Sequence, residues 1–198
     1  MQKLDAKSGR IVMTGGLIAA AVIVADQYTK WFVLEKVLRK GDGAPGFLSW
    51  FTTPVPLSWF MEQQDSYTTD TLTSFLNLVM VWNRGISFGI LDANNPQPPI
   101  LFIGVSLVIS TVLLVWMICM RRPIITAAAS MIIGGAIANS IDRFRFGAVA
   151  DFIDFHVGDR HWPAFNAADS CIVLGAALMI ADSLLTKGDK VPTQAEQV

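Results

Sequence analysis

The chain has 198 residues, of which 53% are hydrophobic and only 16% are charged, and its formal net charge is −1. Charged residues make up about a quarter of an ordinary soluble domain, so this composition argues against one. The near-neutral charge and the lack of a basic stripe give no indication of a nucleic-acid partner.

The apolar residues are concentrated in four long runs, and a membrane-spanning helix needs about 20 such residues. The predicted spans are residues 11–34, 99–120, 124–141 and 166–185. Asp26 and Lys30 interrupt the first run, whereas the second and third contain no charged residue. We therefore expect an all-α membrane protein with four transmembrane helices, forming one integral membrane domain over residues 1–198.

Basic residues predict the orientation of these spans, because cytoplasmic loops carry an excess of Lys and Arg. They occur before the first span, between the second and third, and after the fourth: Lys3, Lys7, Arg10, Arg121, Arg122, Lys187 and Lys190. We expect both termini in the cytoplasm and extracytoplasmic loops at residues 35–98 and 142–165. A cleaved signal peptide ending near Ala25 is an alternative, but the apolar run resumes at residues 31–34, which favours an uncleaved span.

The first outer loop is too long for a structureless connection. Residues 47–61 are rich in Phe and Trp, which suits an interfacial amphipathic segment, with Trp50 and Trp59 at headgroup level. Residues 75–82 and 86–91 are predicted as two short strands around a turn at 83–85.

Helical spacing relates several residues within the spans. Ser130, Gly134 and Ala138 fall four apart and predict a close-packing face for another helix. Asp26 and Lys30 also share a helix face. Two interpretations of that pair remain open: an ion pair near the outer interface with Lys30 snorkelling to water, or a wall of an active site.

Carboxylates at one edge of the membrane are the main functional signal, because ionisable groups are expensive there. Two that lie close together share one proton and activate a water, as in aspartic proteases. Asn166 and Asp169 have the spacing of a helix N-cap and its third residue, where the helix dipole favours an ionised acid.

The spacing does not identify the partner of Asp169. The candidates are Asp142, Asp151, Asp154 and Asp159, and the apolar neighbours of Asp151 mildly favour that residue. Asn139 and Arg143 either anchor a polar helix exit or brace the site. With two histidines, and with Cys119 and Cys171 predicted on opposite faces, we expect no disulfide, no metal site and no cofactor.

Four motifs resemble those of the bacterial lipoprotein signal peptidases (signal peptidase II), and they occur in that family's order. They are DQYTK, WNRGISFG, GGAIANSIDRFRFGAVADFIDF and WPAFNAADS. The resemblance implies that Asp151 and Asp169 are the catalytic pair. It also implies supporting polar residues around the pocket: Asp26, Lys30, Asn83, Asn139, Asp142, Arg143 and Asn166. Family members have four spans, a small β-cradle and a mobile amphipathic helix outside; residues 40–74 are longer here than usual, and Ser87 replaces a common alanine.

The implied function is that of an intramembrane aspartyl endopeptidase of the bacterial inner membrane. Its active site would lie near the outer leaflet and cut signal peptides from diacylglyceryl-modified prolipoproteins, just before the lipidated cysteine. It would contact membrane lipids, act as a monomer and need no cofactor. Two other classes were weighed: a proton-coupled transporter, which would place carboxylates near the bilayer midplane, and an assembly factor, which would need no acid pair.

Overall fold

The computed structural model describes residues 6–39, 43–53, 67–85 and 98–186. Four helices in these ranges are long and apolar enough to cross a membrane. They are α1 (Ala6–Trp31), which continues as the π-helix η1 (Phe32–Leu38), α4 (Pro99–Met120), α5 (Pro123–Phe146) and α6 (Ala167–Thr186). The expected architecture of four spans with a small sheet is present.

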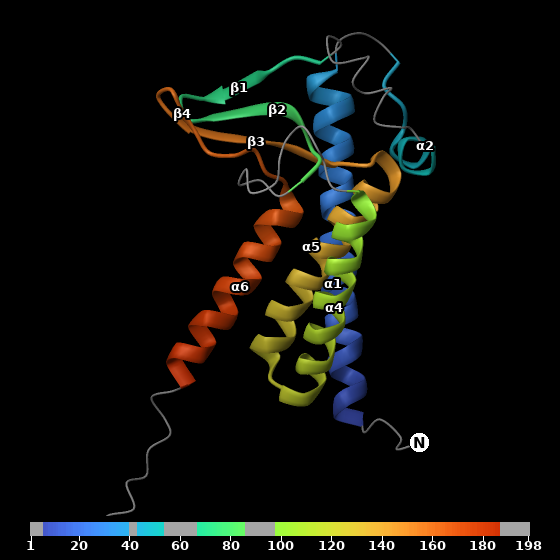
Figure 1. Cartoon of the computed structure of the whole chain (residues 1–198), viewed down its shortest axis with the longest axis vertical. Helices are drawn as coiled ribbons and strands as arrows, with labels where there is room; N and C mark the ends of the chain where they lie inside the picture. Colours follow the sequence, from blue (N-terminus) through green and yellow to red (C-terminus); the bar gives the residue numbers. More distant parts are fainter. Residues whose placement is uncertain (1–5, 40–42, 54–66, 86–97, 187–198) are drawn as a thin grey trace, which may run out of the picture.

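The helices form a bundle with a different structure at each end (Figure 1). A sheet and the short helix α2 (Phe47–Thr52) lie at one end, which we call the sheet end. The start of α1, the α4–α5 turn and the end of α6 lie at the opposite end, which we call the far end. The four helices therefore alternate in direction.

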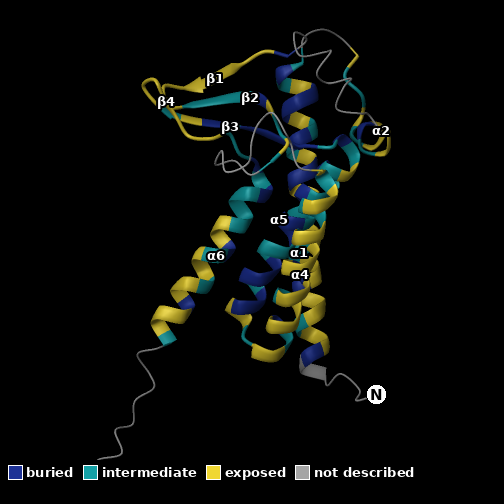
Figure 2. Ribbon diagram, in the orientation of Figure 1, coloured by how far each residue is buried: buried dark blue, intermediate teal, exposed yellow. Residues whose placement is uncertain are grey.

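Helix α5 is the central helix of the bundle. More than half of the most apolar window of α5 is buried inside the protein, whereas very little of the corresponding window of α4 is buried. Figure 2 shows the same contrast between the two helices. An apolar but exposed α4 is what a lipid-facing helix requires, because lipid tails replace a protein core around it.

The small-residue face predicted on α5 is a packing face against α1. A Cβ atom added to Gly134 would lie 2.8 Å from the carbonyl oxygen of Ala19, and one added to Gly15 would lie 2.8 Å from the Ser130 hydroxyl. Glycine at these positions lets the two backbones approach closely.

A second close contact joins α5 to α6. A Cβ atom on Gly135 would lie 2.6 Å from the carbonyl oxygen of Ala168, and one on Gly175 would lie 2.6 Å from that of Ala128. Gly135 therefore fixes the distance between α5 and the first turn of α6, which carries Asp169.

The sheet joins the two outer loops. Its strands are β1 (Asp70–Thr73), β2 (Leu76–Asn83), β3 (Val149–Val157) and β4 (Arg160–His161), in that spatial order and antiparallel. The strand predicted at residues 75–82 is confirmed as β2. It pairs with β3, placing Val81 opposite Asp151. The other predicted strand, at 86–91, lies outside the described residues, as do Ser87 and Trp59.

Helix α5 extends five residues beyond the predicted end of the third span, to Phe146. Asp142 and Arg143 consequently lie on the helix and not in the predicted loop 142–165, which is a correction. The apolar run ends early because the last turns face polar partners inside the protein. Gly147, with φ of 79°, ends the helix in the left-handed conformation that favours glycine.

An apolar cluster at the sheet end holds η1, α2 and the sheet together. It includes Leu34 and Leu38 of η1, Trp50 of α2, and Phe152 of β3, all buried. Burying each large apolar side chain contributes roughly 1.5–3 kcal/mol. The cluster fixes β3 above the first turn of α6.

Candidate active site

Asp169 is held at the N-terminus of α6 by a reciprocal cap. Its backbone N–H donates to Oδ1 of Asn166 (2.9 Å), and the backbone N–H of Asn166 donates to Oδ2 of Asp169 (3.2 Å). The predicted N-cap spacing is therefore confirmed. Asn139 Nδ2 donates to the remaining oxygen, Oδ1, at 2.8 Å. The carboxylate is fixed where the helix dipole stabilises a negative charge.

Asp151 lies on β3 and is almost completely buried. Its Oδ1 accepts a hydrogen bond from Asn166 Nδ2 (2.8 Å), and its Oδ2 accepts one from Asn83 Nδ2 (3.1 Å). Burial, and then the negative charge of Asp169, raise the pKa of Asp151 to about 7. Hydrogen bonds from the two amides, and the charge of Lys30, oppose that rise only in part. The raised pKa favours the protonated form of Asp151 over a wider pH range than for an ordinary aspartate.

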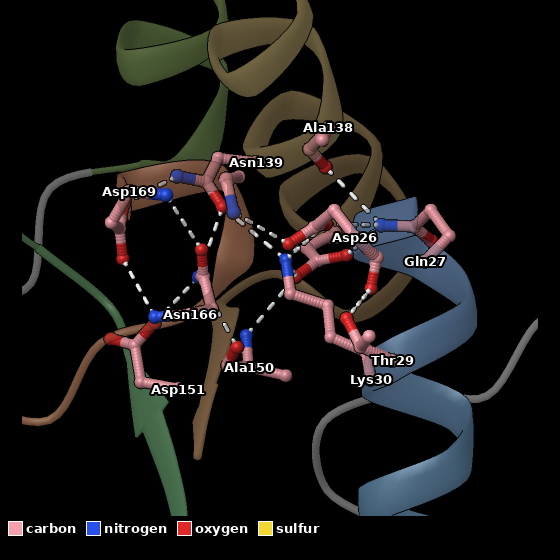
Figure 3. A network of polar contacts seen from close by, with 12 residues as sticks. Asp26, Gln27, Thr29, Lys30, Ala138, Asn139, Ala150, Asp151, Asn166 and Asp169 are labelled. Carbon is pink, nitrogen blue, oxygen red and sulfur yellow. Dashed lines mark hydrogen bonds and ion pairs between the residues drawn. The ribbon is translucent and has the colours of Figure 1, made fainter. Parts of the chain in front are cut away.

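Asn166 connects the two acids, since its side-chain amide contacts Asp151 while its backbone and side-chain oxygen cap Asp169. Figure 3 shows Asn139 and Asn166 between these acids on one side and Lys30 on the other. Of the four candidate partners of Asp169 that the spacing left open, Asp151 is the one whose carboxylate shares a hydrogen-bond donor residue, Asn166, with the Asp169 carboxylate.

The other acids of the second loop have different surroundings. The Asp154 carboxylate accepts a hydrogen bond from Asn77 Nδ2 at 2.9 Å and lies 2.8 Å from His161 Nδ1. Asp159 lies in the exposed β3–β4 turn. The structure does not bring either of them to Asp169.

Lys30, Asp26 and Asp142 form a fully buried triad. Lys30 Nζ lies 2.7 Å from Oδ2 of Asp26 and 2.6 Å from Oδ2 of Asp142. Lys30 is 0% exposed, so the interpretation in which it snorkels to water is wrong. It also donates to Asn139 Oδ1 (3.3 Å), which links the triad to the residue that binds Asp169.

Each carboxylate of the triad also holds the backbone beside one acid of the pair. Asp26 Oδ1 accepts the N–H of Ala168 (2.9 Å), the residue before Asp169. Asp142 Oδ2 accepts the N–H of Ala150 (3.1 Å), the residue before Asp151. Lys30 thus joins two carboxylates that position the two segments carrying the pair.

Two residues of this network were not predicted as site residues. Gln27 donates to Asp142 Oδ1 (2.7 Å) and accepts from Arg145 Nη1 (3.2 Å). Arg145 in turn donates to the carbonyl of Trp50 in α2 (2.5 Å), and its guanidinium lies 4.3 Å from the Trp50 ring centre. The sequence signal that could have identified them is their position next to predicted site residues, since Gln27 follows Asp26 and Arg145 is one turn beyond Asp142.

Arg143 is placed differently from the other predicted supporting residues. Its guanidinium lies over the ring of Phe102, 5.0 Å from its centre, and Nη1 is 3.5 Å from the carbonyl oxygen of Asn139. It interacts with Asp151 and Asp169 through its charge, and within the described part of the chain no hydrogen bond joins it to either acid.

A largely apolar groove of about 580 Å³ opens beside Asp169. The segment before α6 forms one wall, with Trp162 and Phe165, and the first turns of α6 form the other, with Ile172 and Val173. An apolar chain that entered this groove would lie next to a carboxylate. In the described ranges, no three His, Cys, Asp or Glu side chains are placed to hold a metal ion.

Comparisons with known proteins give a consistent result. A family model described as signal peptidase (SPase) II matches residues 18–185. The chain is 40% identical over 141 residues to the lipoprotein signal peptidase of Serratia marcescens, covering 71% of this chain and 82% of that protein. It is 34% identical over 181 residues to that of Rickettsia prowazekii, covering 91% and 77%. A solved bacterial membrane enzyme aligns with a TM-score of 0.67 at 26% identity, covering 93% of this chain and 96% of that one.

Proposed function

The chain belongs to the signal peptidase II family, and we propose that it is a membrane aspartyl endopeptidase that removes signal peptides from prolipoproteins. The observation that carries the catalytic assignment is that one residue, Asn166, donates hydrogen bonds to both carboxylates beside an apolar groove, from its side chain to Asp151 and from its backbone N–H to Asp169. Asn83, Asn139 and the Lys30 triad have supporting roles, because they contact the two acids or the backbone beside them.

The different surroundings of the two acids support a different role for each. Asp151 carries the shared proton near neutral pH because its pKa is raised to about 7, and Asp169 is the carboxylate at the helix N-terminus. The oxygen of a water molecule attacks the scissile carbonyl while Asp169 takes a proton from that water. Asp151 gives its proton to the developing oxyanion. When the C–N bond breaks, the proton on Asp169 passes to the leaving amine, and a hydroxyl of the tetrahedral intermediate returns a proton to Asp151 as the new carboxyl group forms.

The apolar lining of the groove favours a substrate that carries a lipid. Burying an acyl chain contributes about 0.8 kcal/mol per CH₂, and the groove beside Asp169 is lined mainly by apolar residues. If the cut lies just before a cysteine that carries a diacylglyceryl group, acyl chains in the groove hold the scissile bond near the pair. Such positioning supplies several kcal/mol of the barrier.

We place the sheet end at the outer leaflet of the bacterial inner membrane and both termini in the cytoplasm, with the chain acting as a monomer. Arg10, Arg121 and Arg122 lie at the far end of the bundle, which supports that orientation through the excess of basic residues on cytoplasmic faces. The substrate's signal helix then lies in the bilayer, with its end at the pair.

The test is cleavage of a purified prolipoprotein, with and without its diacylglyceryl group, followed by mass shift. Asp151→Asn should abolish cleavage. Asp154→Asn, the same change on the same strand, should not, because Asp154 contacts Asn77 and His161 instead of the pair. An active Asp151→Asn with an inactive Asp154→Asn would contradict the assignment. Equal rates on both substrates would remove the lipid from recognition.

A further inference from the structure

Helix α2 is too short to be stable by itself. Its six residues form less than two turns, and isolated helices of fewer than about 12 residues are marginal in water. Two side chains of the bundle bind its backbone. Trp31 Nε1 donates to the carbonyl oxygen of Pro45, two residues before α2 begins, at 2.9 Å, and Arg145 of α5 donates to that of Trp50. The position of α2 therefore depends on its contacts with α1 and α5.

Arg145 binds α2 at the end where carbonyl groups lack partners within the helix. The last four carbonyl groups of a helix find no N–H inside it, and that of Trp50 is one of them. Arg145 Nη2 donates to this oxygen at 2.5 Å. The guanidinium also lies over three rings, 4.3 Å from the centres of Trp50 and Phe146 and 4.9 Å from that of Phe51. A hydrogen bond and cation–π contacts thus hold Arg145 against α2.

The other terminal nitrogen of Arg145 reaches the buried triad through Gln27. Arg145 Nη1 donates to Gln27 Oε1 (3.2 Å), and Gln27 Nε2 donates to Asp142 Oδ1 (2.7 Å). Gln27 is buried, and Nε2 also lies 3.4 Å from the carbonyl oxygen of Ala138 in α5 (Figure 3). The reversed amide would direct its N–H groups at the guanidinium, where there is no acceptor. Arg145 therefore fixes which end of the Gln27 amide faces Asp142.

The hydrogen bond from Gln27 restricts the orientation of the Asp142 carboxylate. Oδ1 accepts from Gln27, while Oδ2 lies 2.6 Å from Lys30 Nζ and accepts the N–H of Ala150 at 3.1 Å. Ala150 directly precedes Asp151 on β3. Because Oδ1 is held, the carboxylate cannot rotate freely, and Oδ2 stays directed at β3. Four consecutive hydrogen bonds thus connect α2 with the backbone beside Asp151.

We propose that Arg145 is a positioning residue for the cleavage reaction, which holds Asp151 in place through Gln27 and Asp142 as long as α2 is bound. The inference rests on the proposed function, since it assigns Arg145 a part in that reaction. Within the described residues, no hydrogen bond joins Arg145 to either acid of the pair. Arg145 therefore acts on the rate through the position of β3 and not through proton transfer.

The experiment compares kcat, KM and the unfolding midpoint of Arg145→Met, Gln27→Leu and the double variant. Methionine keeps an apolar side chain among the rings but removes both donors. Each single change should lower kcat by about tenfold with little change in KM. This is less than the roughly 10²-fold cost of a 1 Å misplacement, because Lys30 still binds Asp142. The double variant should be no slower than the slower single one, since both residues act through one series of hydrogen bonds. Losses that multiply, or an unchanged kcat in Arg145→Met, would overturn the proposal.

Two further variants separate positioning from a general effect of charge. Lys36→Met is the matched control, because Lys36 Nζ also lies over a ring that contacts α2, 5.5 Å from the centre of Trp31. Within the described residues Lys36 has no hydrogen bond to the triad, so kcat should stay unchanged. Arg145→Lys keeps a cation but lacks the planar fork that binds two acceptors, so it should restore the unfolding midpoint and not kcat. An equal fall in kcat in Lys36→Met, or full kcat in Arg145→Lys, would contradict the positioning role.

Trp50→Leu tests the dependence on α2, because it removes one of the rings that hold the guanidinium. It should lower kcat in the unmodified chain but not in Arg145→Met, where the connection is already broken. An equal fall in both backgrounds would overturn that dependence. Failure of the proposed function would be distinct, since Asp151→Asn would then remain active. Failure of this proposal alone would leave Asp151→Asn inactive and Arg145→Met fully active.

Discussion

Both ends of the bundle contain ion pairs, fully buried at the sheet end and partly exposed at the far end, and these groups do different things. At the sheet end, Lys30 joins two carboxylates that bind the backbone directly before Asp151 and Asp169. At the far end, the pair between Arg122 and Asp182 joins α6 to the α4–α5 turn, and Arg122 also donates to the Thr186 hydroxyl. One set of charges positions a site, and the other fastens two elements together.

The energetics support that distinction. A buried ion pair rarely adds net stability, because desolvation offsets the attraction between the charges. The triad at the sheet end has two acids and one base, all fully buried, so it is a costly arrangement. The two carboxylates accept hydrogen bonds from the backbone N–H groups of Ala150 and Ala168. This positioning of the backbone is the functional reason for an arrangement that is costly to bury. Variants at the two ends should therefore separate effects on rate from effects on stability.

The largest effect should come from the pair itself. Asp151→Asn and Asp169→Asn should each lower kcat by roughly 10²–10⁴-fold or more, because each removes one proton-transfer group. The double variant should be little worse than either single one, since groups that act as a unit lose their contribution together. Initial rates and unfolding midpoints of the three variants check this. Losses that multiply in the double variant would mean that the two acids act independently.

The next prediction tests whether Asp26 acts through its acceptor oxygen or through its negative charge. Asp26→Asn and Asp26→Leu both remove the negative charge, but only Asn keeps an oxygen for the N–H of Ala168. Asp26→Leu should lower kcat by about 10²-fold, the scale of a 1 Å misplacement, while Asp26→Asn retains most of it. Steady-state kinetics on membranes with matched protein amounts would show the difference. Equal kcat values for the two variants would leave the triad with no positioning role.

The matching change at the far end should affect stability alone. Asp182→Asn removes the carboxylate that accepts both hydrogen bonds from Arg122. We expect a lower unfolding midpoint, by about 2–4 °C for each kcal/mol lost, and an unchanged kcat. Because the Arg122 side chain is 37% exposed, solvent reduces the loss. A fall in kcat with no change in the midpoint would show that the two ends are coupled.

A smaller effect should appear in the pH dependence. Activity requires the proton on Asp151, so it should fall as pH rises through about 7, the pKa of that carboxyl. Asn83 donates a hydrogen bond that stabilises the ionised form. Asn83→Leu should therefore raise the pKa and move the alkaline fall in kcat/KM to higher pH. An acid-side rise in kcat/KM that moves to higher pH, with the alkaline fall unchanged, would mean that Asp151 acts as the base.

The sequence predicts the features that depend on local spacing. Apolar runs predict the four helices. A three-residue spacing predicts the cap of Asp169, and a four-residue spacing predicts the packing face at Gly134. For the polar end of α5 the sequence predicts a loop, because hydropathy does not distinguish a solvated segment from a polar segment buried in a hydrogen-bond network.

Long-range pairing accounts for most of what spacing alone did not predict. Strand β3 pairs with β2 from the other outer loop, and no local pattern identifies that partner. Spacing also left the partner of Asp169 open, since four aspartates shared one loop, and only the family motifs singled out Asp151. Gln27 was missed because a lone amide beside Asp26 has no distinguishing pattern, whereas in three dimensions it lies between Asp142 and Arg145.

The most direct test of the paired acids is a pH titration of the Asp151 carboxyl, followed by carbon-13 NMR of labelled aspartate. The Asp151→Asn spectrum identifies its signal. The midpoint should lie at about 7 in the unmodified chain. In Asp169→Asn it should fall, because a neighbouring negative charge is removed, yet stay above the ordinary aspartate value because burial persists. A midpoint that Asp169→Asn leaves unchanged would contradict the claim that the two acids share a proton.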